Sequence, residues 1–493
     1  MSTDTIKQHI HHADRFFIGG QWVKPAGSSR IDVRDSATEE VFVSVAEAQV
    51  EDVDRAVAAA RKAFDHGPWP RLSHQERAGW LNKIADAWMA RSGAFADTWT
   101  SESGVLHSVA RMAVIGPVMT FRFHAGLADT FAWEHPHVSQ DGKRAMITRE
   151  PVGVVGAIVP WNAPGALMAY KVAAALIAGC TVVVKGSPEA PTSPYLLAQI
   201  CAEIGLPEGV FNFVTADREV SERLVRHPGV DKISFTGSTA AGRRIASICG
   251  ERIARCTLEL GGKSPALILD DYDLDTAAES IAQSARFLTG QVCSSLTRLI
   301  VSRKRHDDFV EALSSRFSKV RVGNPFDDTT EMGPLAMERQ RDRVESYIAK
   351  GRAEGARLAT GGGRPAELER GYFIEPTVFA NVDNHSTIAR EEIFGPVLSV
   401  IAAESEEQAI DIANDTIYGL NASVFTNDPE RAYAVARRVR AGTVGHNGFK
   451  TDFTISFGGF KQSGLGREGG TEGMHSFLEA KTIILDQRPP QAS

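Results

Sequence analysis

One cysteine of the chain lies among small and polar neighbours. Cys293 stands in the stretch TGQVCSSLTR, residues 289–298, and the chain has only five cysteines. Buried cysteines usually sit among apolar side chains and behave as small hydrophobes. Gly290 instead leaves room for another group to approach. The stretch predicts either a reactive thiol or a simple loop, and other parts of the sequence must decide between them.

An acidic residue, Glu259, stands inside an apolar strand-like run in CTLELGGKSP and is followed by glycines. Burying an unpaired charge is costly, so this carboxyl group must be paired, neutral or functional. Taken alone, the pattern favours neither structural pairing nor catalysis.

A third candidate is FTGST, residues 235–239, where Ser238 and Thr239 follow a strand and open a helix. A helix N-terminus can hold a phosphate group. The favoured interpretation of this stretch alone is a simple helix cap. The chain has no GxGxxG motif, so an ordinary Rossmann fingerprint is absent.

The elements that must hold these residues alternate between strand and helix. From Val152 on, the short apolar runs GVVGAIV, TVVVK, FNFVT and KISFTG are separated by helix-length segments such as 165–179 and 192–204. This alternation predicts a parallel sheet with both faces covered, and ligands of such sheets bind at the carboxyl ends of the strands. The residues that follow the strands are Trp161 and Asn162, Lys185 to Glu189, and Gly237 and Ser238.

Three further segments complete the predicted organisation. The N-terminal third is helical and amphipathic, and one of its helices begins with a capping box of Ser73 and Glu76. A second α/β segment, with strands PALIL and TRLIV, runs from about 261 to 447. Residues 135–151 form a predicted hairpin with a turn at Asp141-Gly142, and this hairpin and the C-terminal run KTIILDQ are candidate intersubunit strands.

Composition narrows the classes of partner. The chain has 493 residues, 43% of them hydrophobic and 23% charged, so two or three globular domains are expected. A formal charge of −7 without long single-sign runs argues against nucleic acid or an anionic membrane as the main partner. The odd number of cysteines and the absence of CxxC predict neither a disulfide framework nor a zinc site. The cluster of His9, His11 and His12 indicates a frayed terminus rather than a metal site.

The sequence favours a cytoplasmic location. No charged and apolar leader opens the chain. Residues 151–170 carry no charge over about the length that a bilayer needs, but Pro160 and Pro164 interrupt them. We therefore expect a buried strand to Val159, a turn, and a buried helix to about Ala178, not a membrane span.

Taken together, these motifs resemble the aldehyde dehydrogenase superfamily over nearly the whole chain. Several long motifs in family order make a chance match negligible. They are PWNAP (160–164), VVVKGSPEAP (182–191), FTGSTAAG (235–242), LELGGKSP (258–265), GQVC (290–293), EEIFGPV (391–397) and FGGFKQSGLGRE (457–468).

The resemblance implies a role for each motif residue. Cys293 matches the family's nucleophile, Glu259 its general base and Asn162 its oxyanion donor. A cysteine thiolate converts an aldehyde, a poor hydride donor, into a tetrahedral adduct and later leaves from the thioester. The expected cofactor contacts are Val159, Pro160, Trp161, Lys185, Ser187, Glu189, Phe235, Gly237, Ser238, Leu260, Glu392 and Phe394.

The cofactor segment departs from the family's pattern. Gly186 replaces the usual proline, and Pro188 stands where a glutamate commonly bonds the adenosine ribose, with Glu189 one residue later. The sequence TADREV (215–220) also replaces a glycine-rich loop. We expect NAD, because Glu189 can still reach the ribose and would repel a 2′-phosphate, and NADP stays open as the alternative.

The substrate segment departs as well. Many relatives have an aromatic residue where this chain has Ala163, and the smaller residue should widen the tunnel. No arginine marks the anchor loop 448–457 for a carboxylate substrate, although Lys450 is present. A hydrophobic aldehyde of medium or large size is therefore expected. The predicted substrate contacts are Ala163, Leu167, Tyr170, Phe453 and Phe457.

The resemblance implies an α/β fold with two parallel-sheet domains and a small β oligomerisation element. We expect a cofactor domain at 1–133 and 152–260, a catalytic domain at 261–447, a substrate loop and FGG segment at 448–474, and the oligomerisation element at 134–151 and 475–493. The expected assembly is a homodimer or homotetramer. Two alternatives are a coenzyme A-acylating relative, which would generally lack the base glutamate, and a non-catalytic structural relative.

Overall fold

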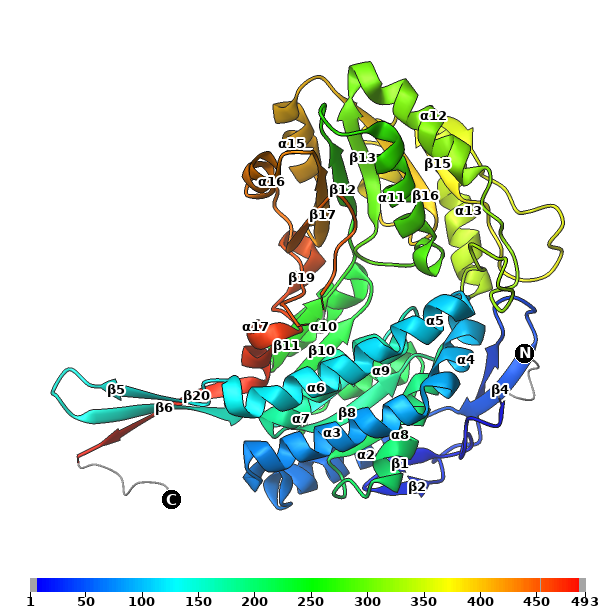
Figure 1. Cartoon of the computed structure of the whole chain (residues 1–493). Helices are drawn as coiled ribbons and strands as arrows, with labels where there is room; N and C mark the ends of the chain where they lie inside the picture. The colour runs from blue at the N-terminus through cyan, green and yellow to red at the C-terminus, as the bar shows by residue number, and fades with distance from the viewer. Residues whose placement is uncertain (1–6, 453, 487–493) are drawn as a thin grey trace.

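The computed structural model describes residues 7–452 and 454–486 as two lobes with a projecting arm (Figure 1). Four sheets organise this part of the chain, with strand orders β19-β11-β10-β7-β8-β9-β1-β2, β14-β15-β16-β13-β12-β17-β18, β20-β6-β5 and β3-β4. The strands are β1 (Phe16–Ile18), β2 (Gln21–Val23), β3 (Arg30–Arg34), β4 (Val41–Ala46), β5 (Glu134–Val138), β6 (Arg144–Pro151), β7 (Val154–Ile158), β8 (Thr181–Gly186), β9 (Phe211–Thr215), β10 (Lys232–Thr236), β11 (Arg255–Glu259), β12 (Ser264–Ile268), β13 (Leu296–Ser302), β14 (Arg357–Thr360), β15 (Thr377–Ala380), β16 (Val397–Ala403), β17 (Asn421–Phe425), β18 (Thr443–His446), β19 (Gly464–Leu465) and β20 (Leu478–Leu485).

The helices cover the sheets and connect their strands. The α-helices are α2 (Val50–Asp65), α3 (His74–Ala90), α4 (Ser92–Ser103), α5 (His107–Ala113), α6 (Ile115–Thr130), α7 (Pro164–Ala178), α8 (Thr192–Glu203), α9 (Arg218–Arg226), α10 (Thr239–Glu251), α11 (Leu274–Arg286), α12 (His306–Phe317), α13 (Glu338–Ala353), α14 (Thr387–Arg390), α15 (Glu406–Asn414), α16 (Pro429–Ala436) and α17 (Gly470–Met474). The short 3₁₀ helices are η1 (Trp69–Arg71), η2 (Phe287–Gly290), η3 (Arg303–Arg305), η4 (Lys461–Ser463) and η5 (His475–Phe477).

The lower lobe in Figure 1 contains the eight-stranded sheet. Strands β11, β10, β7, β8 and β9 are parallel, and antiparallel strands lie at both edges. Alternate residues of β8 point to opposite faces, so Val183 packs with α2, α9 and α10, whereas Val182 and Val184 pack with α7 and α8. Helices α3 and α6 form a further layer against α7. This burial on both faces explains the almost uninterrupted apolar runs of the sequence.

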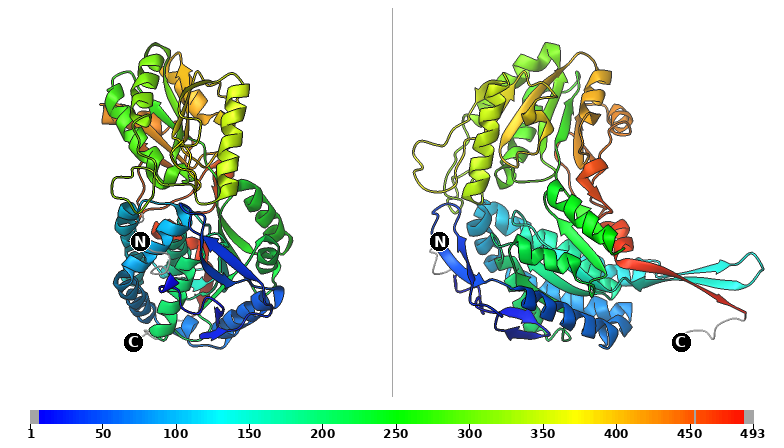
Figure 2. Two further views of the ribbon diagram at one scale, coloured as in Figure 1. Left: turned by 90° about the vertical axis from the view of Figure 1, so that its right-hand side faces the viewer. Right: turned by 180° about the vertical axis from the view of Figure 1, so that it is seen from behind.

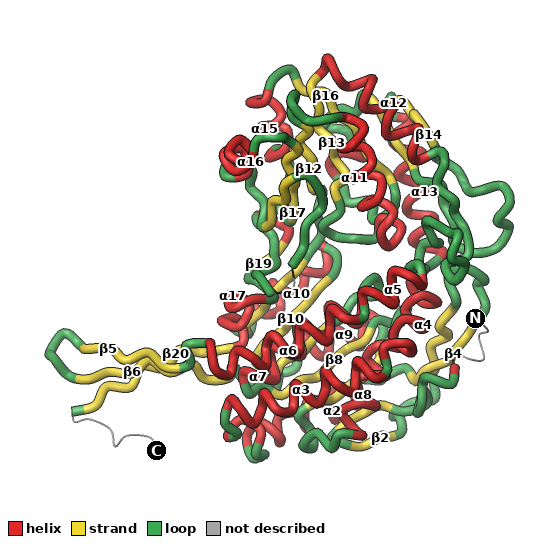
Figure 3. Tube along the Cα trace, in the orientation of Figure 1, coloured by secondary structure: helices red, strands yellow, loops and turns green. Residues whose placement is uncertain are grey.

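The upper lobe is built in the same way around the seven-stranded sheet. Its strands are parallel except for β14 at one edge. Along β12, Ala266 and Ile268 face the core that includes α11 and α12, and Leu267 faces the core that includes α15 and α16. Figure 3 shows that loops make up much of the chain where the two lobes meet.

The arm consists of β5, β6 and β20, and it projects from the lower lobe in Figure 1 and in the right-hand view of Figure 2. The predicted hairpin is confirmed, because Ser139 donates its backbone N–H to the Lys143 carbonyl and Gly142 turns the chain at φ 79°. Strand β20, far away in sequence, pairs with β6 from Leu478↔Pro151 to Leu485↔Arg144. The intersubunit role of these strands stays a prediction.

Local sequence signals place the other elements that matter for the site. The helices expected at 165–179 and 192–204 are observed as α7 and α8. The capping box that starts α3 is confirmed, since Ser73 and Glu76 bond reciprocally. The uncharged stretch 151–170 divides between β7 and α7. Within the described ranges, no helix is both long enough and apolar enough to cross a bilayer.

Candidate active site

The loop that carries Cys293 runs from η2 to β13, and its backbone is strained. Leu288 and Thr289 adopt left-handed φ values of 49° and 53°, which are uncommon for residues other than glycine. Gly290 continues at φ 72°, and a Cβ atom there would lie 2.4 Å from the carbonyl carbon of Gly395. The glycine that the sequence offered as room for a ligand is thus also required by the fold.

Hydrogen bonds to buried groups hold this conformation. The Gln291 side chain donates from Nε2 to the Leu288 carbonyl and accepts at Oε1 from the Ala336 N–H, each over 2.9 Å. Thr289 Oγ1 donates to the Gly333 carbonyl over 3.0 Å. Because partners from distant segments fix the loop on several sides, Cys293 is presented in a defined, half-buried position.

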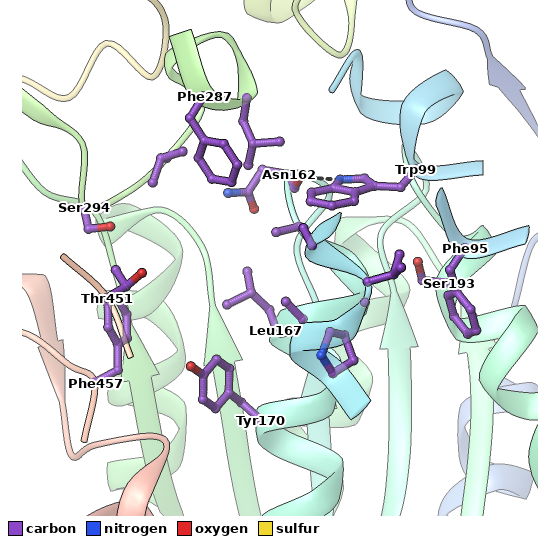
Figure 4. A pocket seen from close by; sticks show the side chains of 18 of the residues that line it. Phe95, Trp99, Asn162, Leu167, Tyr170, Ser193, Phe287, Ser294, Thr451 and Phe457 are labelled. Carbon is purple, nitrogen blue, oxygen red and sulfur yellow. Dashed lines mark hydrogen bonds between the residues drawn. The ribbon is translucent and has the colours of Figure 1, made fainter. Parts of the chain in front are cut away.

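Asn162 stands in the loop between β7 and α7 and reaches the cysteine loop. Its Nδ2 donates to the carbonyl of Gln291 over 2.9 Å, and its own backbone carbonyl accepts from Trp99 Nε1 over 2.9 Å (Figure 4). A side-chain amide has two N–H donors, so the second remains available for an oxygen atom near Cys293. The structure therefore brings these two predicted residues together.

Glu259 is the last residue of β11 and is only 2% exposed. Neither carboxyl oxygen has a hydrogen-bond partner within the described part of the chain. Burial, reinforced by the nearby Glu468 carboxylate, raises the pKa of Glu259 well above its usual value. Of the three possibilities set by the sequence, pairing is excluded among the described residues, and a neutral or functional carboxyl group remains.

The segment after Glu259 packs directly on the cysteine loop. A Cβ atom on Gly262 would lie 2.3 Å from the Cys293 carbonyl oxygen, and one on Gly261 would lie 2.3 Å from Glu392 Oε2. Burial, followed by the charges of Glu392 and Glu259, raises the pKa of Cys293 to about 12. The thiol in this structure therefore holds its proton at neutral pH and needs a base or a favourable charge to ionise.

The twelve predicted cofactor residues lie on facing edges of the lobes. Ten of them come from the carboxyl ends of β7, β8, β10 and β11 or from the loops that follow, and the last two come from the segment between α14 and β16. Trp161 and Phe394 meet edge to face across this boundary, with ring centroids 5.4 Å apart. Gly237 is needed here, since a Cβ atom would lie 2.5 Å from the Phe235 ring.

Charged and capping groups mark the same edge. Burial lowers the pKa of Lys185 to about 8, and the charges of Glu189 and Asp217 oppose that shift. Ser238 caps α10 by accepting from the Ala241 N–H over 3.3 Å, which confirms the cap interpretation of FTGST. In the other lobe, burial raises the pKa of Glu392 to about 7.

One contact at this edge was not apparent from the sequence. Glu189 accepts from Ser187 Oγ through one carboxyl oxygen and pairs with Arg339 of α13 through the other. The two partners of this ion pair are 150 residues apart and belong to different lobes. No local pattern links them, so sequence reasoning could not find Arg339.

A cavity of about 190 Å³ lies beside the cysteine loop (Figure 4). Four of the predicted substrate contacts, Ala163, Leu167, Tyr170 and Phe457, line it, and the fifth, Phe453, lies outside the described residues. The lining also includes residues that the sequence analysis missed, among them Trp88, Phe95, Trp99, Gly165, Ser193, Phe287, Phe449 and Thr451. The cavity is mainly apolar, with Asn162 and Ser294 at the side of Cys293.

Comparison with known proteins connects this arrangement to a family. A model of the aldehyde dehydrogenase family matches residues 22–483. Geranial dehydrogenase of Castellaniella defragrans is 45% identical over 97% of this chain and 98% of its own length. The crystal structure of an aldehyde dehydrogenase of Mycobacterium tuberculosis complexed with NAD⁺ superposes with a TM-score of 0.94, at 44% identity over 97% of this chain and 99% of that one. A cysteine-to-alanine variant of aldehyde dehydrogenase C of Pseudomonas syringae, complexed with NAD⁺ and octanal, has a TM-score of 0.93 at 41% identity over 96% of this chain and 97% of that one.

Proposed function

The chain belongs to the aldehyde dehydrogenase family, and we propose that it oxidises hydrophobic aldehydes of medium or large size to carboxylic acids with NAD. The observation that carries the proposal is the convergence of Cys293, Asn162 and Glu259, which has no partner among the described residues, beside an apolar cavity. These three groups act in three successive steps of the reaction.

The first step is attack on the aldehyde. The Cys293 thiolate adds to the carbonyl carbon, and the oxygen becomes an oxyanion. The free N–H of the Asn162 side chain and the backbone N–H of Cys293 would donate to that oxygen. A donor of this kind is typically worth about 3–4 kcal/mol in the transition state.

The second step is oxidation of the adduct. When bound, NAD⁺ accepts the hydride that leaves the tetrahedral carbon. As the hydride departs, the oxyanion collapses to a carbonyl, and a thioester of Cys293 is left. Asn162 holds the oxygen through this step, so the geometry of the Gln291 contact bears on the oxidation as well as on the attack.

The third step releases the acid. The carboxylate form of Glu259 takes a proton from water, the resulting hydroxide adds to the thioester, and the Cys293 thiolate leaves. An unpartnered carboxyl group suits this task, since no ion pair must be broken before it accepts a proton. Its raised pKa makes the carboxylate a stronger proton acceptor than an ordinary glutamate.

The residues of the facing edges fit a dinucleotide. The N-terminus of α10 and the buried Lys185 suit phosphate and hydroxyl groups, and Glu189 suits the hydroxyls of a ribose. A 2′-phosphate beside Glu189 would be repelled, so NAD is the preferred form. Arg339 reduces this repulsion of a 2′-phosphate because it pairs with the Glu189 carboxylate. Relatives with NAD⁺ bound support the assignment.

The cavity supports the proposed substrate size. Ala163 leaves open a volume that an aromatic side chain would fill, and Tyr170 and Phe457 provide apolar walls. Each methylene group removed from water contributes about 0.8 kcal/mol, so longer aldehydes bind better until the cavity is full. The related proteins that act on geranial or bind octanal are consistent with this preference.

The proposal extends to the arrangement of the protein. We propose that the lower lobe binds the cofactor, that the upper lobe presents Cys293, and that the arm of β5, β6 and β20 joins subunits of a cytoplasmic homodimer or homotetramer. The arm supports this role because the residues of β5 and β20 are largely exposed and the arm projects away from the lower lobe.

The test is an assay of purified protein with octanal, NAD and no coenzyme A. We expect one NADH and one octanoic acid for each octanal consumed. NADH formation that appears only after coenzyme A is added, with octanoyl-coenzyme A as the product, would establish the acylating alternative. No NADH from any of a series of alkanals, with either NAD or NADP, would leave the structural alternative.

A further inference from the structure

We propose that the cavity continues into a side chamber, formed by Trp88, Phe95, Gly165 and Ser193, that binds the far end of the aldehyde and recognises a hydrogen-bonding group there. This inference rests on the proposed function and specifies its substrate class. All four residues line the cavity that contains Asn162 and Ser294. Figure 4 shows Phe95 and Ser193 on the opposite side of the cavity from Ser294.

Gly165 opens the way into the chamber. It lies in the first turn of α7, next to Ala163 and Ala166, so three small residues face the region where a larger side chain would project. A Cβ atom on Gly165 would lie 3.3 Å from Trp88 Cζ2 and 3.5 Å from Ser193 Oγ. Even the methyl group of an alanine at position 165 would therefore occupy part of the space between α7 and these two residues.

The apolar wall of the chamber is rigid. Trp88 of α3 and Phe95 of α4 stack with ring centroids 3.8 Å apart and planes 8° apart. Both are almost completely buried, at 1% and 2% exposure. Flat, fixed aromatic faces favour an apolar chain or ring and contribute area at little cost in side-chain entropy.

Ser193 supplies a hydroxyl group to the chamber, and the indole Nε1 of Trp88 is a further polar atom there without a hydrogen-bond partner among the described residues. The Ser193 side chain comes from the first turn of α8, is 2% exposed, and makes no hydrogen bond to any residue that the structure describes. Its Oγ lies 3.5 Å from the position that a Cβ atom on Gly165 would occupy. A buried hydroxyl without a partner is costly, and a ligand that supplies one recovers a hydrogen bond.

The chamber thus matches one class of aldehyde: an apolar chain or ring that carries a hydroxyl or carbonyl oxygen at the end opposite the aldehyde group. The apolar middle would lie along Leu167 and over Gly165, and the distal oxygen would reach Ser193. Short aldehydes would react at Cys293 without entering the chamber.

The test compares straight alkanals with matched ω-hydroxyalkanals, from propanal to dodecanal. The ratio of kcat/KM for the hydroxylated and plain aldehyde should pass through a maximum at the length that reaches Ser193. Ser193→Ala should lower that maximum about 2- to 12-fold, the range expected for one hydrogen bond, and leave propanal unchanged. Gly165→Ala should move the maximum or remove it, again with propanal unchanged.

A matched control separates recognition from packing. Ser101 of α4 is a buried serine whose hydroxyl has no partner in the described part of the chain, and it does not line the cavity. Ser101→Ala should leave the length profile as it is. A ratio that does not depend on length, equal losses in both series for Ser193→Ala, or the same change in Ser101→Ala would each overturn the proposal.

Binding without turnover keeps this inference separate from the proposed function. Long ω-hydroxyalkanamides resemble the substrates but have no aldehyde to oxidise. Calorimetry should show tighter binding to the wild-type protein than to Ser193→Ala. If they bind in this way and no aldehyde yields NADH, the chamber stands and the proposed oxidation fails. If aldehydes are oxidised but the amides do not distinguish the two proteins, the chamber fails alone.

Discussion

Replacing Glu259 with glutamine separates the two halves of the proposed reaction. The change keeps the size of the side chain and removes only its ability to take a proton. Because neither oxygen of Glu259 bonds another described residue, the amide breaks no existing contact. Attack by Cys293 and hydride transfer should therefore proceed, and the protein should stop as a thioester.

The size of the effect follows from the task that is removed. Loss of a general base typically slows a step about 10²–10⁴-fold, which corresponds to about 3–5 kcal/mol of barrier. Rapid mixing with NAD and octanal should give a burst of NADH that approaches one per active site, and then very slow turnover. If Glu259 also takes the proton of Cys293, the burst itself slows in the variant. Higher pH should then partly restore the burst rate, because the thiol can lose its proton to the solvent without Glu259.

The raised pKa of Glu259 gives an independent measurement on the same variant. The folded protein holds a proton on this group that the unfolded chain loses at lower pH, so its contribution to stability disappears as pH rises through the folded-state pKa. Glutamine does not ionise. The thermal stability of the variant relative to the wild type should therefore increase with pH, with each unit of pKa elevation worth about 1.4 kcal/mol.

Normal steady-state turnover in Glu259→Gln would refute both roles of Glu259, because glutamine cannot take a proton from water or from the thiol. A variant in which burst and steady-state rates fall in the same ratio would indicate a structural role instead. Relative stability that does not vary with pH would show that the carboxyl group is not held neutral by its surroundings.

The remaining predictions concern the nucleophile, the cofactor and the tunnel. Cys293→Ala should abolish turnover while NAD binding, followed by fluorescence, is kept, and Cys201→Ala, in a buried helical site, should lower stability but keep turnover. Arg339→Ala should raise the ratio of kcat/KM for NAD over NADP about 5-fold, because a surface charge pair is worth about 1 kcal/mol. Glu189→Gln should lower the same ratio. A shift in the same direction in both variants would contradict the ion-pair argument. Ala163→Phe should lower kcat/KM for octanal about 4-fold for each methylene that no longer fits, and it should change kcat/KM for propanal little. Equal losses across the series would show that Ala163 does not line the substrate path.

The parts of the fold that the sequence predicted are those set by local rules. The periodicity and the apolar runs of the sequence predicted β7, α7, β8 and α8. The reciprocal hydrogen bonds of Ser73 and Glu76 fix the start of α3 within one turn. The order of strand and helix was enough to place Asn162, Lys185 and Ser238 at the same edge of a sheet, because parallel strands end on the same side.

Contacts that depend on distant segments were not predictable in this way. The Arg339–Glu189 pair joins different lobes, and the side chamber needs α3, α4, α7 and α8 to meet. The sequence did indicate extra space at Ala163, which stands where many relatives have an aromatic residue. Packing between helices decides which residues border this space, Trp88 and Ser193 among them. The spacing of residues in the sequence does not predict that packing.

The site itself is where the protein departs most clearly from ordinary stability rules. Glu259 is buried with no partner among residues 7–452 and 454–486, Leu288 and Thr289 adopt a left-handed backbone, and burial and negative charges oppose ionisation of Cys293. The buried carboxyl group and the left-handed backbone each cost free energy in the folded state. A purely structural protein would gain by losing them, since a neutral side chain at 259 would pack as well. That they occur together around one cavity is explained if the fold spends stability to hold a nucleophile and a base ready for an aldehyde, which is why stabilising substitutions at this site should reduce turnover.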